Sequence, residues 1–198
     1  MKLIGLTGGI ASGKSTVAAI LRRLGAAIIN ADDLSREVVQ PGQEAWQEII
    51  DTFGSQILQE DQTLDRKKLR RIVFDNREAR QKLEAIIHPR VRSLAEQRVR
   101  ELAAAGSSII VYEVPLLFEN QIHLWLRPVI LVACDMATQK NRLQKRDHLT
   151  DTEARQHLEA QMSLADKRKL ADYVIDNNGS LEELEQQVRA VLQKIQAT

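Results

Sequence analysis

The chain has 198 residues, of which 43% are hydrophobic and 28% are charged, and its formal net charge is +1. This length and composition fit one globular α/β domain with a sizeable core. A charge near zero and 4% aromatic residues argue against nucleic acid or membrane partners. We find no signal peptide and no membrane span, so we expect a cytoplasmic protein, a monomer or small homo-oligomer. The single cysteine, Cys134, lies in an apolar run and is expected to be buried and structural.

The first part of the chain alternates between predicted strand and helix. Residues 2–8 are an apolar strand, followed by a glycine-rich turn and a helix from Lys14 to Leu24, which Gly25 ends. Ala26 to Ala31 is a second apolar run. Apolar runs that alternate with helices favour a parallel sheet with helices on both faces.

The middle of the chain, residues 43–105, contains no convincing strand. Helical periodicity and helix-ending residues predict a series of helices: Glu44–Phe53, Asp65–Phe74, Arg77–Ile87, and a further one from Pro89 to Ala105. We interpret residues 33–107 as a helical insert that binds a second substrate. The alternative is that these helices merely cover one face of the sheet.

Strand and helix alternate again in the last part of the chain. The runs Ser108–Val114, Val129–Cys134 and Tyr173–Ile175 predict three more strands, which makes five. Residues 138–170 are helical, charged and poor in large apolar residues, so we expect a lid there. Capping boxes are predicted at Thr150–Glu153 and Ser180–Glu183. The last helix carries one apolar stripe: Leu181, Leu184, Val188, Val191 and Ile195.

The turn after the first strand matches the phosphate-loop pattern G-x-x-x-x-G-K-S/T. Small residues let the backbone approach an anion closely, and the following helix directs its positive end at the phosphates. Lys14 can reach the β- and γ-phosphates, and the hydroxyl of Ser15 can ligate Mg²⁺. The residues predicted to bind ATP here are Gly8, Gly9, Ala11, Ser12, Gly13, Lys14, Ser15 and Thr16.

The class of phosphate-loop protein is narrowed by what the rest of the chain lacks and contains. The Asn-Lys-x-Asp motif of a GTPase switch is missing, and a mechanical ATPase is usually larger. Ile109–Glu113 approximates the strand that ends in a Mg²⁺-holding acid, with Glu113 as that acid. A small kinase is the best fit. A nucleotide-gated binding module with slow hydrolysis remains an alternative.

A candidate catalytic base follows the second strand. Ligands of open α/β sheets bind beyond the carboxyl ends of the strands, where Asp32 and Asp33 lie. We expect Asp32 to accept the proton of the acceptor hydroxyl and Asp33 to cap a helix that begins at Leu34. Arg36 could bind an acidic group of the acceptor or be a solvated surface residue.

The chain resembles the dephospho-coenzyme A kinases over essentially its whole length. The resemblance rests on "LTGGIASGKST" at the start, "NADDLSREVVQPG" at 30–42 and "IIHPRV" at 86–91. It continues with "VPLLFE" at 114–119 and "VIDNNG" at 174–179. Shikimate and nucleoside monophosphate kinases share the phosphate loop but not this set, although a kinase of that kind is the nearest rival.

The resemblance implies a P-loop kinase fold and transfer of the γ-phosphate of ATP, with Mg²⁺, to the 3′-hydroxyl of dephospho-CoA, the last step of CoA synthesis. It makes Asp32 the base and the insert the CoA-binding part. It assigns Arg142 and Arg146 of the lid to the transferring phosphate and places a loop of Asn177, Asn178 and Gly179 near the adenine. It gives the acceptor site these residues: Asp32, Arg36, His88, Leu116, Leu117 and Glu119.

Three positions depart from the pattern of the family. Ala11 stands where glycine is frequent, and its methyl group is tolerable only if φ there is negative. Asn30 replaces a frequent aspartate, which favours Asp32 as the base. Glu113 stands where many members have aspartate, so its Mg²⁺ role is an open question.

Overall fold

The computed structural model describes residues 1–74 and 76–197. The chain divides into two compact units: unit 1 comprises Met1–Ile29 and Leu102–Thr198, and unit 2 comprises Asn30–Glu101. Within the described residues, no helix has both the length and the hydropathy to cross a membrane.

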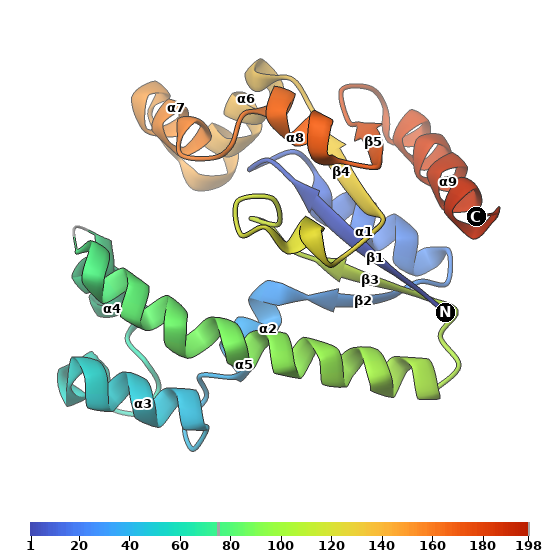
Figure 1. Cartoon of the computed structure of the whole chain (residues 1–198). Helices are drawn as coiled ribbons and strands as arrows, with labels where there is room; N and C mark the ends of the chain where they lie inside the picture. The colour runs from blue at the N-terminus through green and yellow to red at the C-terminus, as the bar shows by residue number, and fades with distance from the viewer. Residues whose placement is uncertain (75, 198) are drawn as a thin grey trace. The chain divides into compact units, whose positions relative to one another are not determined.

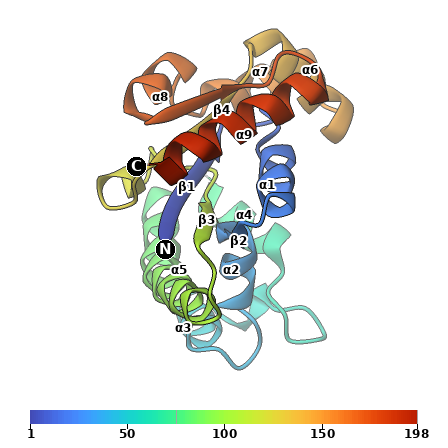
Figure 2. The ribbon, with the colours of Figure 1, turned by 90° about the vertical axis from the view of Figure 1, so that its right-hand side faces the viewer.

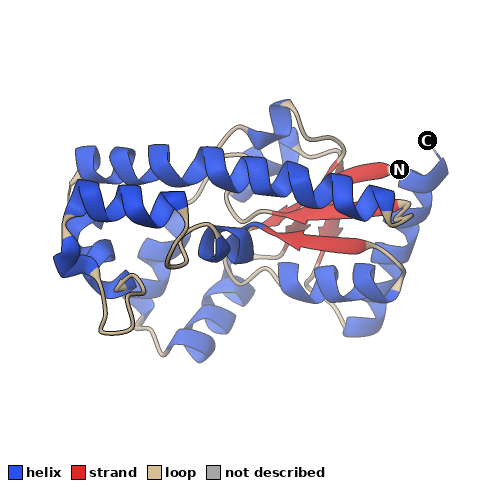
Figure 3. Ribbon diagram, turned by 90° about the horizontal axis from the view of Figure 1, so that it is seen from below, coloured by secondary structure: helices blue, strands red, loops and turns tan. Residues whose placement is uncertain are grey.

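A five-stranded sheet organises unit 1 (Figure 1). The strand order is β2-β3-β1-β4-β5, with bounds β1 Lys2–Gly8, β2 Ala27–Asn30, β3 Ile109–Glu113, β4 Val129–Ala133 and β5 Tyr173–Asp176. β1 pairs in parallel with β3 and β4, and β4 pairs in parallel with β5. Figure 3 shows the strands side by side with their arrows in one direction. The predicted five-stranded parallel sheet is therefore confirmed.

Two helices pack on one face of this sheet, α1 (Lys14–Arg23) and α9 (Leu181–Ala197), and Figure 2 shows them beside the strands. Val17 and Ile20 of α1 share a buried cluster with Leu184 and Val188 of α9. The predicted stripe on α9 is confirmed except at Leu181, which is 62% exposed. Leu181 is the first residue of the helix, before the packed stretch that begins at Leu184.

The segment between β4 and β5 contains α6 (Met136–Asp147), α7 (Asp151–Glu159) and α8 (Leu164–Leu170). The capping box at Thr150 is present, since Thr150 and Glu153 exchange both hydrogen bonds. Ser180 and Glu183 form the same reciprocal pair before α9. Cys134, just after β4, is buried as predicted, and burial raises the pKa of its thiol.

Unit 2 is built from α2 (Ala31–Glu37), α3 (Glu44–Phe53), α4 (Arg66–Phe74) and most of α5 (Arg77–Ala104), with one 3-10 turn at Ser55–Ile57. These elements surround their own apolar cluster, which includes Val38, Ile49, Ile57, Leu69 and Ile86. Over residues 43–74 and 76–105 the structure contains no strand, only an isolated bridge between Leu58 and Leu64. The absence of a strand from this block is as predicted.

Helix α5 corrects the prediction that Pro89 opens a separate helix. Pro89 lies inside one helix that runs from Arg77 to Ala104. A proline in a helix interior removes a hydrogen bond and costs about 3 kcal/mol. Apolar residues on both sides of it, such as Leu83 and Val91, pack against the same cluster and offset that cost. Tertiary packing thus overrides the local signal.

Candidate active site

The glycine-rich loop follows the central strand and leads into α1. Gly13 is the residue before α1 and has a φ of 91°, which only glycine adopts without strain. A Cβ at Gly13 would also lie 2.0 Å from Nδ2 of Asn177. Gly8 is constrained by space, because a Cβ there would lie 2.5 Å from Oγ of Ser12. Both glycines of the motif are therefore required by the fold of the loop itself.

Ala11 contradicts the expectation of a negative φ. Its φ is 57°, in the left-handed region. A residue with a Cβ pays about 1 kcal/mol or more for this conformation. The loop keeps its shape at this position in spite of the methyl group and stores a modest strain.

The loop is braced by Asn177, which follows β5. Nδ2 of Asn177 donates to the carbonyl of Ser12 at 2.7 Å, and its backbone N–H donates to Ala133 at 2.7 Å. Nη2 of Arg142 donates to the carbonyl of Asn177 at 3.3 Å, and Nη1 of Arg142 is buried with no hydrogen-bond partner among the described residues. Asn177 is only 7% exposed. Its side chain is thus part of the loop's support.

The two residues after Asn177 are also tied to neighbouring elements. Oδ1 of Asn178 accepts from the backbone N–H of Asp135, the residue that caps α6, at 2.8 Å. A Cβ at Gly179 would collide with Oε2 of Glu183, at 1.9 Å. The predicted adenine loop therefore joins the phosphate loop to the starts of α6 and α9.

Lys14 forms an ion pair with Glu113 of β3, and both side chains are largely buried. Ser15, the next residue of α1, is exposed. The hydroxyl of Ser15 and the carboxylate of Glu113 are oxygen ligands of the type that Mg²⁺ takes, together with phosphate oxygens and water. The donor set predicted for the metal therefore fits. Among the described residues there is no cluster of three or more His, Cys, Asp or Glu that would form a metal site by itself.

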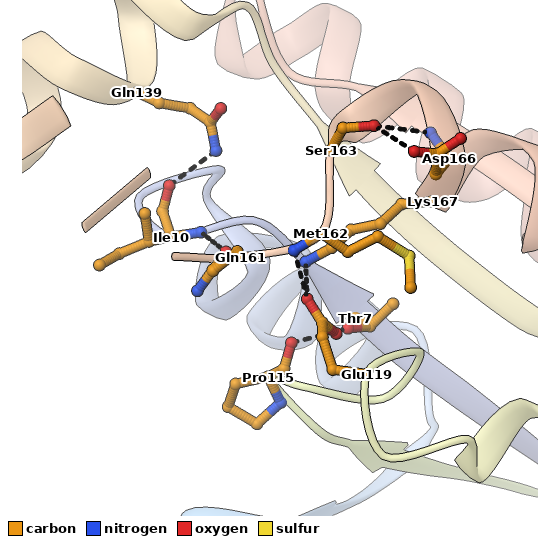
Figure 4. A network of polar contacts seen from close by, with 10 residues as sticks. All are labelled: Thr7, Ile10, Pro115, Glu119, Gln139, Gln161, Met162, Ser163, Asp166 and Lys167. Carbon is orange, nitrogen blue, oxygen red and sulfur yellow. Dashed lines mark hydrogen bonds and ion pairs between the residues drawn. The ribbon is translucent and has the colours of Figure 1, made fainter. Parts of the chain in front are cut away.

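The tip of the phosphate loop is held by two glutamines that the sequence did not reveal (Figure 4). Nε2 of Gln139, on α6, donates to the carbonyl of Ile10 at 2.8 Å. The backbone N–H of Ile10 donates to Oε1 of Gln161 at 3.0 Å. Single glutamines in a charged helical segment follow no pattern, so sequence offered no signal for them.

The two arginines of the segment predicted to be a lid, Arg142 and Arg146, differ in their surroundings. Arg142 lies against the loop, as its contact with Asn177 shows. Arg146 is exposed and forms two hydrogen bonds of 2.8 Å with Asp147, which raise its pKa above the ordinary value. Only the first of the two therefore contacts this part of the site in the structure.

The loop after β3 carries three residues predicted for the acceptor. Leu117 is fully buried, and a Cβ at Gly5 would touch its side chain at 3.0 Å, so Leu117 belongs to the core. Leu116 is 41% exposed. Oε1 of Glu119 accepts from the backbone N–H of Met162 at 3.1 Å and lies 2.8 Å from Nζ of Lys167. In this structure, Leu116 is therefore the member of this set with an exposed side chain.

In unit 2, the start of α2 differs from the prediction. The helix begins at Ala31, and Asn30 caps it: Oδ1 of Asn30 accepts from the backbone N–H of Asp32 at 2.8 Å and of Asp33 at 3.3 Å. The prediction that Asp33 caps a helix beginning at Leu34 is therefore wrong. Asp33 instead contacts Arg36 at 3.2 Å. The Asp32 carboxylate is exposed and has no hydrogen-bond partner within residues 1–74 and 76–197.

His88 is exposed and lies in the interior of α5, one residue before Pro89. Its side chain therefore projects from the middle of a continuous helix and not from a helix end. The basic run on α4 contains Arg66, Lys67, Arg70 and Arg71, and within the described residues none of these four forms an ion pair.

A phosphate loop between the central strand and α1, with its lysine paired to an acid on the adjacent strand, defines this chain as a P-loop nucleotide-binding protein. The fold agrees, since shikimate kinase from Acinetobacter baumannii superposes with a TM-score of 0.53 at 17% identity over 100% of this chain and 94% of its own. The family model described as CoaE, dephospho-CoA kinase, matches residues 2–183. The chain belongs to the dephospho-CoA kinase family.

Individual relatives are similar to this chain over nearly its whole length. Dephospho-CoA kinase from Geobacillus kaustophilus is 47% identical over 96% of this chain and 95% of its own. The enzyme from Geobacter sulfurreducens is 47% identical over 98% of each chain. Among solved structures, dephospho-CoA kinase from Campylobacter jejuni has a TM-score of 0.74 at 30% identity over 98% of each chain. A Thermus thermophilus protein has a TM-score of 0.82 at 36% identity over 98% of this chain and 97% of its own.

Proposed function

We propose that this chain transfers the γ-phosphoryl group of ATP to the ribose 3′-hydroxyl of dephospho-CoA and releases CoA and ADP. The observation that carries the proposal is an intact phosphate loop, with Lys14 held by Glu113, in a chain that the family model covers from residue 2 to 183. The loop supplies a phosphate site, and the family supplies the acceptor.

The phosphate side of the reaction uses positive charge and backbone N–H groups. The loop around Gly13 and the start of α1 bind the phosphates, and Lys14 neutralises the β- and γ-phosphates. Arg142 already lies against the loop, and its Nη1 is buried without a partner among the described residues. We infer that Arg142 donates to a phosphate, and that Arg146 exchanges Asp147 for the transferring group. Asn177 supports the phosphate loop through its hydrogen bond to the carbonyl of Ser12, while Asn178 and Gly179 border the nucleotide.

Ser15 and Glu113 would hold Mg²⁺ with the phosphates of ATP. When bound, the ion neutralises the charge of the phosphates and so favours attack by an oxygen nucleophile. In this scheme Glu113 binds both Mg²⁺ and Lys14, because its ion pair also fixes the lysine beside the phosphate loop.

The acceptor side requires a base and a surface for the rest of the substrate. Asp32 follows the end of β2 by two residues, and Asn30 takes over the capping of α2. The Asp32 carboxylate is thereby left to accept the proton of the 3′-hydroxyl as the phosphorus–oxygen bond forms. The remaining acceptor contacts that we propose come from Arg36, His88 and Leu116, while the buried Leu117 and the ion-paired Glu119 hold the loop that carries Leu116.

The direct test is a mass-resolved assay with ATP, Mg²⁺ and dephospho-CoA, run beside a panel that contains shikimate and nucleoside monophosphates. We expect CoA and ADP in equal amounts, with the new phosphate on the 3′-oxygen. Consumption of a different acceptor would establish the rival kinase. Loss of ATP at a rate independent of any acceptor would establish the binding module with slow hydrolysis.

The role of Asp32 is tested by comparing Asp32→Asn with Asp33→Asn, its neighbour on the same exposed turn of α2. We expect Asp32→Asn to lower kcat by about a hundredfold or more, with an unchanged dissociation constant for ATP. Asp33→Asn should change kcat less than about twofold, because it loses only an exposed ion pair with Arg36. Equal effects of the two variants would refute the assignment of the base.

A further inference from the structure

Helix α8 is attached to unit 1 in an unusual way. Its one fully buried side chain is a cation, Lys167, at 1% exposure. Lysine is almost never buried unless an acid neutralises it. A helix this short would ordinarily be anchored by an apolar residue, so the presence of a lysine calls for a specific partner.

That partner is Glu119, in the loop after β3. Nζ of Lys167 lies 2.8 Å from Oε1 of Glu119, which also accepts the backbone N–H of Met162 at 3.1 Å. The other carboxylate oxygen, Oε2, is buried and has no hydrogen-bond partner in the described part of the chain. The Lys167 side chain is removed from water almost completely while Glu119 remains 21% exposed. Taking the lysine charge out of water costs more than burying a methionine of similar length, so stability by itself does not explain this pair.

The pair stands at one end of a connected set of contacts (Figure 4). Met162 donates to Glu119, and Gln161, its neighbour in the sequence, accepts from Ile10 in the phosphate loop. Two adjacent residues therefore hold the loop after β3 on one side and the phosphate loop on the other. Gln139 holds Ile10 independently through its carbonyl.

We propose that Lys167 is a positioning residue of the kinase, which fixes Glu119 and with it the loop after β3 that carries the exposed Leu116. The proposal rests on the proposed function, because that loop is the one assigned to the acceptor. Lys167 touches no substrate in this scheme. Its ammonium group acts through the Glu119 carboxylate, and the loop position that results sets the affinity for the acceptor.

The test measures KM for dephospho-CoA and for ATP, kcat, and the melting temperature of the purified full chain. Lys167→Met should raise KM for dephospho-CoA about tenfold, because loss of the ion pair lets Glu119 and its loop move away from the position that binds the acceptor. KM for ATP should rise less than about threefold, because Gln139 still holds Ile10. A merely structural role would lower the melting temperature and the active fraction without moving either KM.

A double-mutant cycle makes the test independent of the stability of the single variant. Lys167→Met combined with Glu119→Gln leaves no unpaired charge, and the glutamine oxygen can still accept from Met162. If the two residues act as one unit, the double variant has the same increase in KM for dephospho-CoA, about tenfold, as either single variant. An increase of about a hundredfold, the product of the two single effects, would mean that they act separately and would overturn the proposal.

A matched control lies two residues further along α8. Lys169 forms an exposed ion pair with Asp166, at 2.8 Å. Lys169→Met should leave both KM values and kcat within about twofold of the wild type. An acceptor KM that is unchanged in Lys167→Met, or in the double variant if the single one does not fold, would overturn the inference. Wild-type protein without turnover of dephospho-CoA would instead overturn the proposed function.

Discussion

Asn177 is the residue whose replacement tests the architecture of the phosphate loop most directly. Its Nδ2 donates to the carbonyl of Ser12 at 2.7 Å in a buried position. Asn177→Ala leaves that carbonyl without a donor, which costs about 1–3 kcal/mol of unfolding free energy. Asn177→Asp preserves the shape but places an acceptor against an acceptor and buries a charge. We therefore expect it to cost more, about 3 kcal/mol or above, in spite of being nearly isosteric.

The two variants should also differ in their response to pH. Burial raises the pKa of the carboxyl group that Asn177→Asp introduces, whereas Arg142, which contacts Asn177, lowers it; we expect burial to dominate, so that the folded protein favours the neutral form. The neutral form can donate to Ser12, so the penalty is largest above that raised pKa and shrinks as the pH falls towards the unfolded value near 4. Relative to the wild type, Asn177→Asp should thus be less destabilised at about pH 5 than at about pH 8.

The measurement is urea unfolding of wild type, Asn177→Ala, Asn177→Asp and a control, Asn178→Asp, at both pH values. Oδ1 of Asn178 accepts a backbone N–H, which a carboxylate does equally well, so the control should lose less than about 1 kcal/mol. A stability of Asn177→Asp at pH 8 equal to or above that of Asn177→Ala would refute the reasoning. So would a penalty that is the same at both pH values.

Two further predictions concern Gly13 of the phosphate loop and Tyr112 of β3. Gly13→Ala combines a φ of 91° with a contact of 2.0 Å to Asn177, so it should cost about 3 kcal/mol in urea unfolding and weaken ATP binding in calorimetry. Wild-type affinity for ATP in that variant would contradict the loop geometry. Burial raises the pKa of Tyr112 from 10.0 to about 12, so its contribution to stability is complete below pH 10.0 and is lost as the pH rises to 12. The wild type should lose about 2–3 kcal/mol over that range through this group, and Tyr112→Phe should lose correspondingly less; parallel curves would exclude Tyr112 as the cause.

The strands and most helices could be predicted because their signals are local. The apolar run at residues 2–8 and the capping box at Thr150 depend on neighbours within a few residues, and the structure places both where the sequence indicated. The phosphate loop is equally local, since glycine spacing and the lysine define it. The φ angles of the loop could not be predicted from the sequence. Ala11 adopts a φ of 57°, and the loop around it is held by contacts distant in sequence, such as that of Gln139 with Ile10.

The contacts that sequence reasoning missed act over long separations. Gln139 and Gln161, which were not predicted, reach Ile10 across 129 and 151 positions. Asn177, predicted beside the adenine, also reaches Ser12 across 165 positions. No periodicity encodes such contacts. The start of α2 was missed for a different reason: Asn30, Asp32 and Asp33 are all good capping residues, and only the backbone decides which one is used.

The contacts of the segment between β4 and β5 bear on the prediction that it acts as a lid. Helices α6, α7 and α8 each bury one side chain fully: Leu143, Ala154 and Lys167. Such helices gain little from apolar burial and are held largely by hydrogen bonds and ion pairs. Water can replace a hydrogen bond at a net cost of only about 1 kcal/mol, whereas a buried leucine costs about 2 kcal/mol or more to expose. A segment attached in this way can exchange Gln139, Gln161 and Arg142 between the protein and a bound nucleotide without unfolding. The buried Lys167, paired with Glu119, is the attachment that water replaces least easily, so we expect the segment to pivot near α8 rather than to detach there.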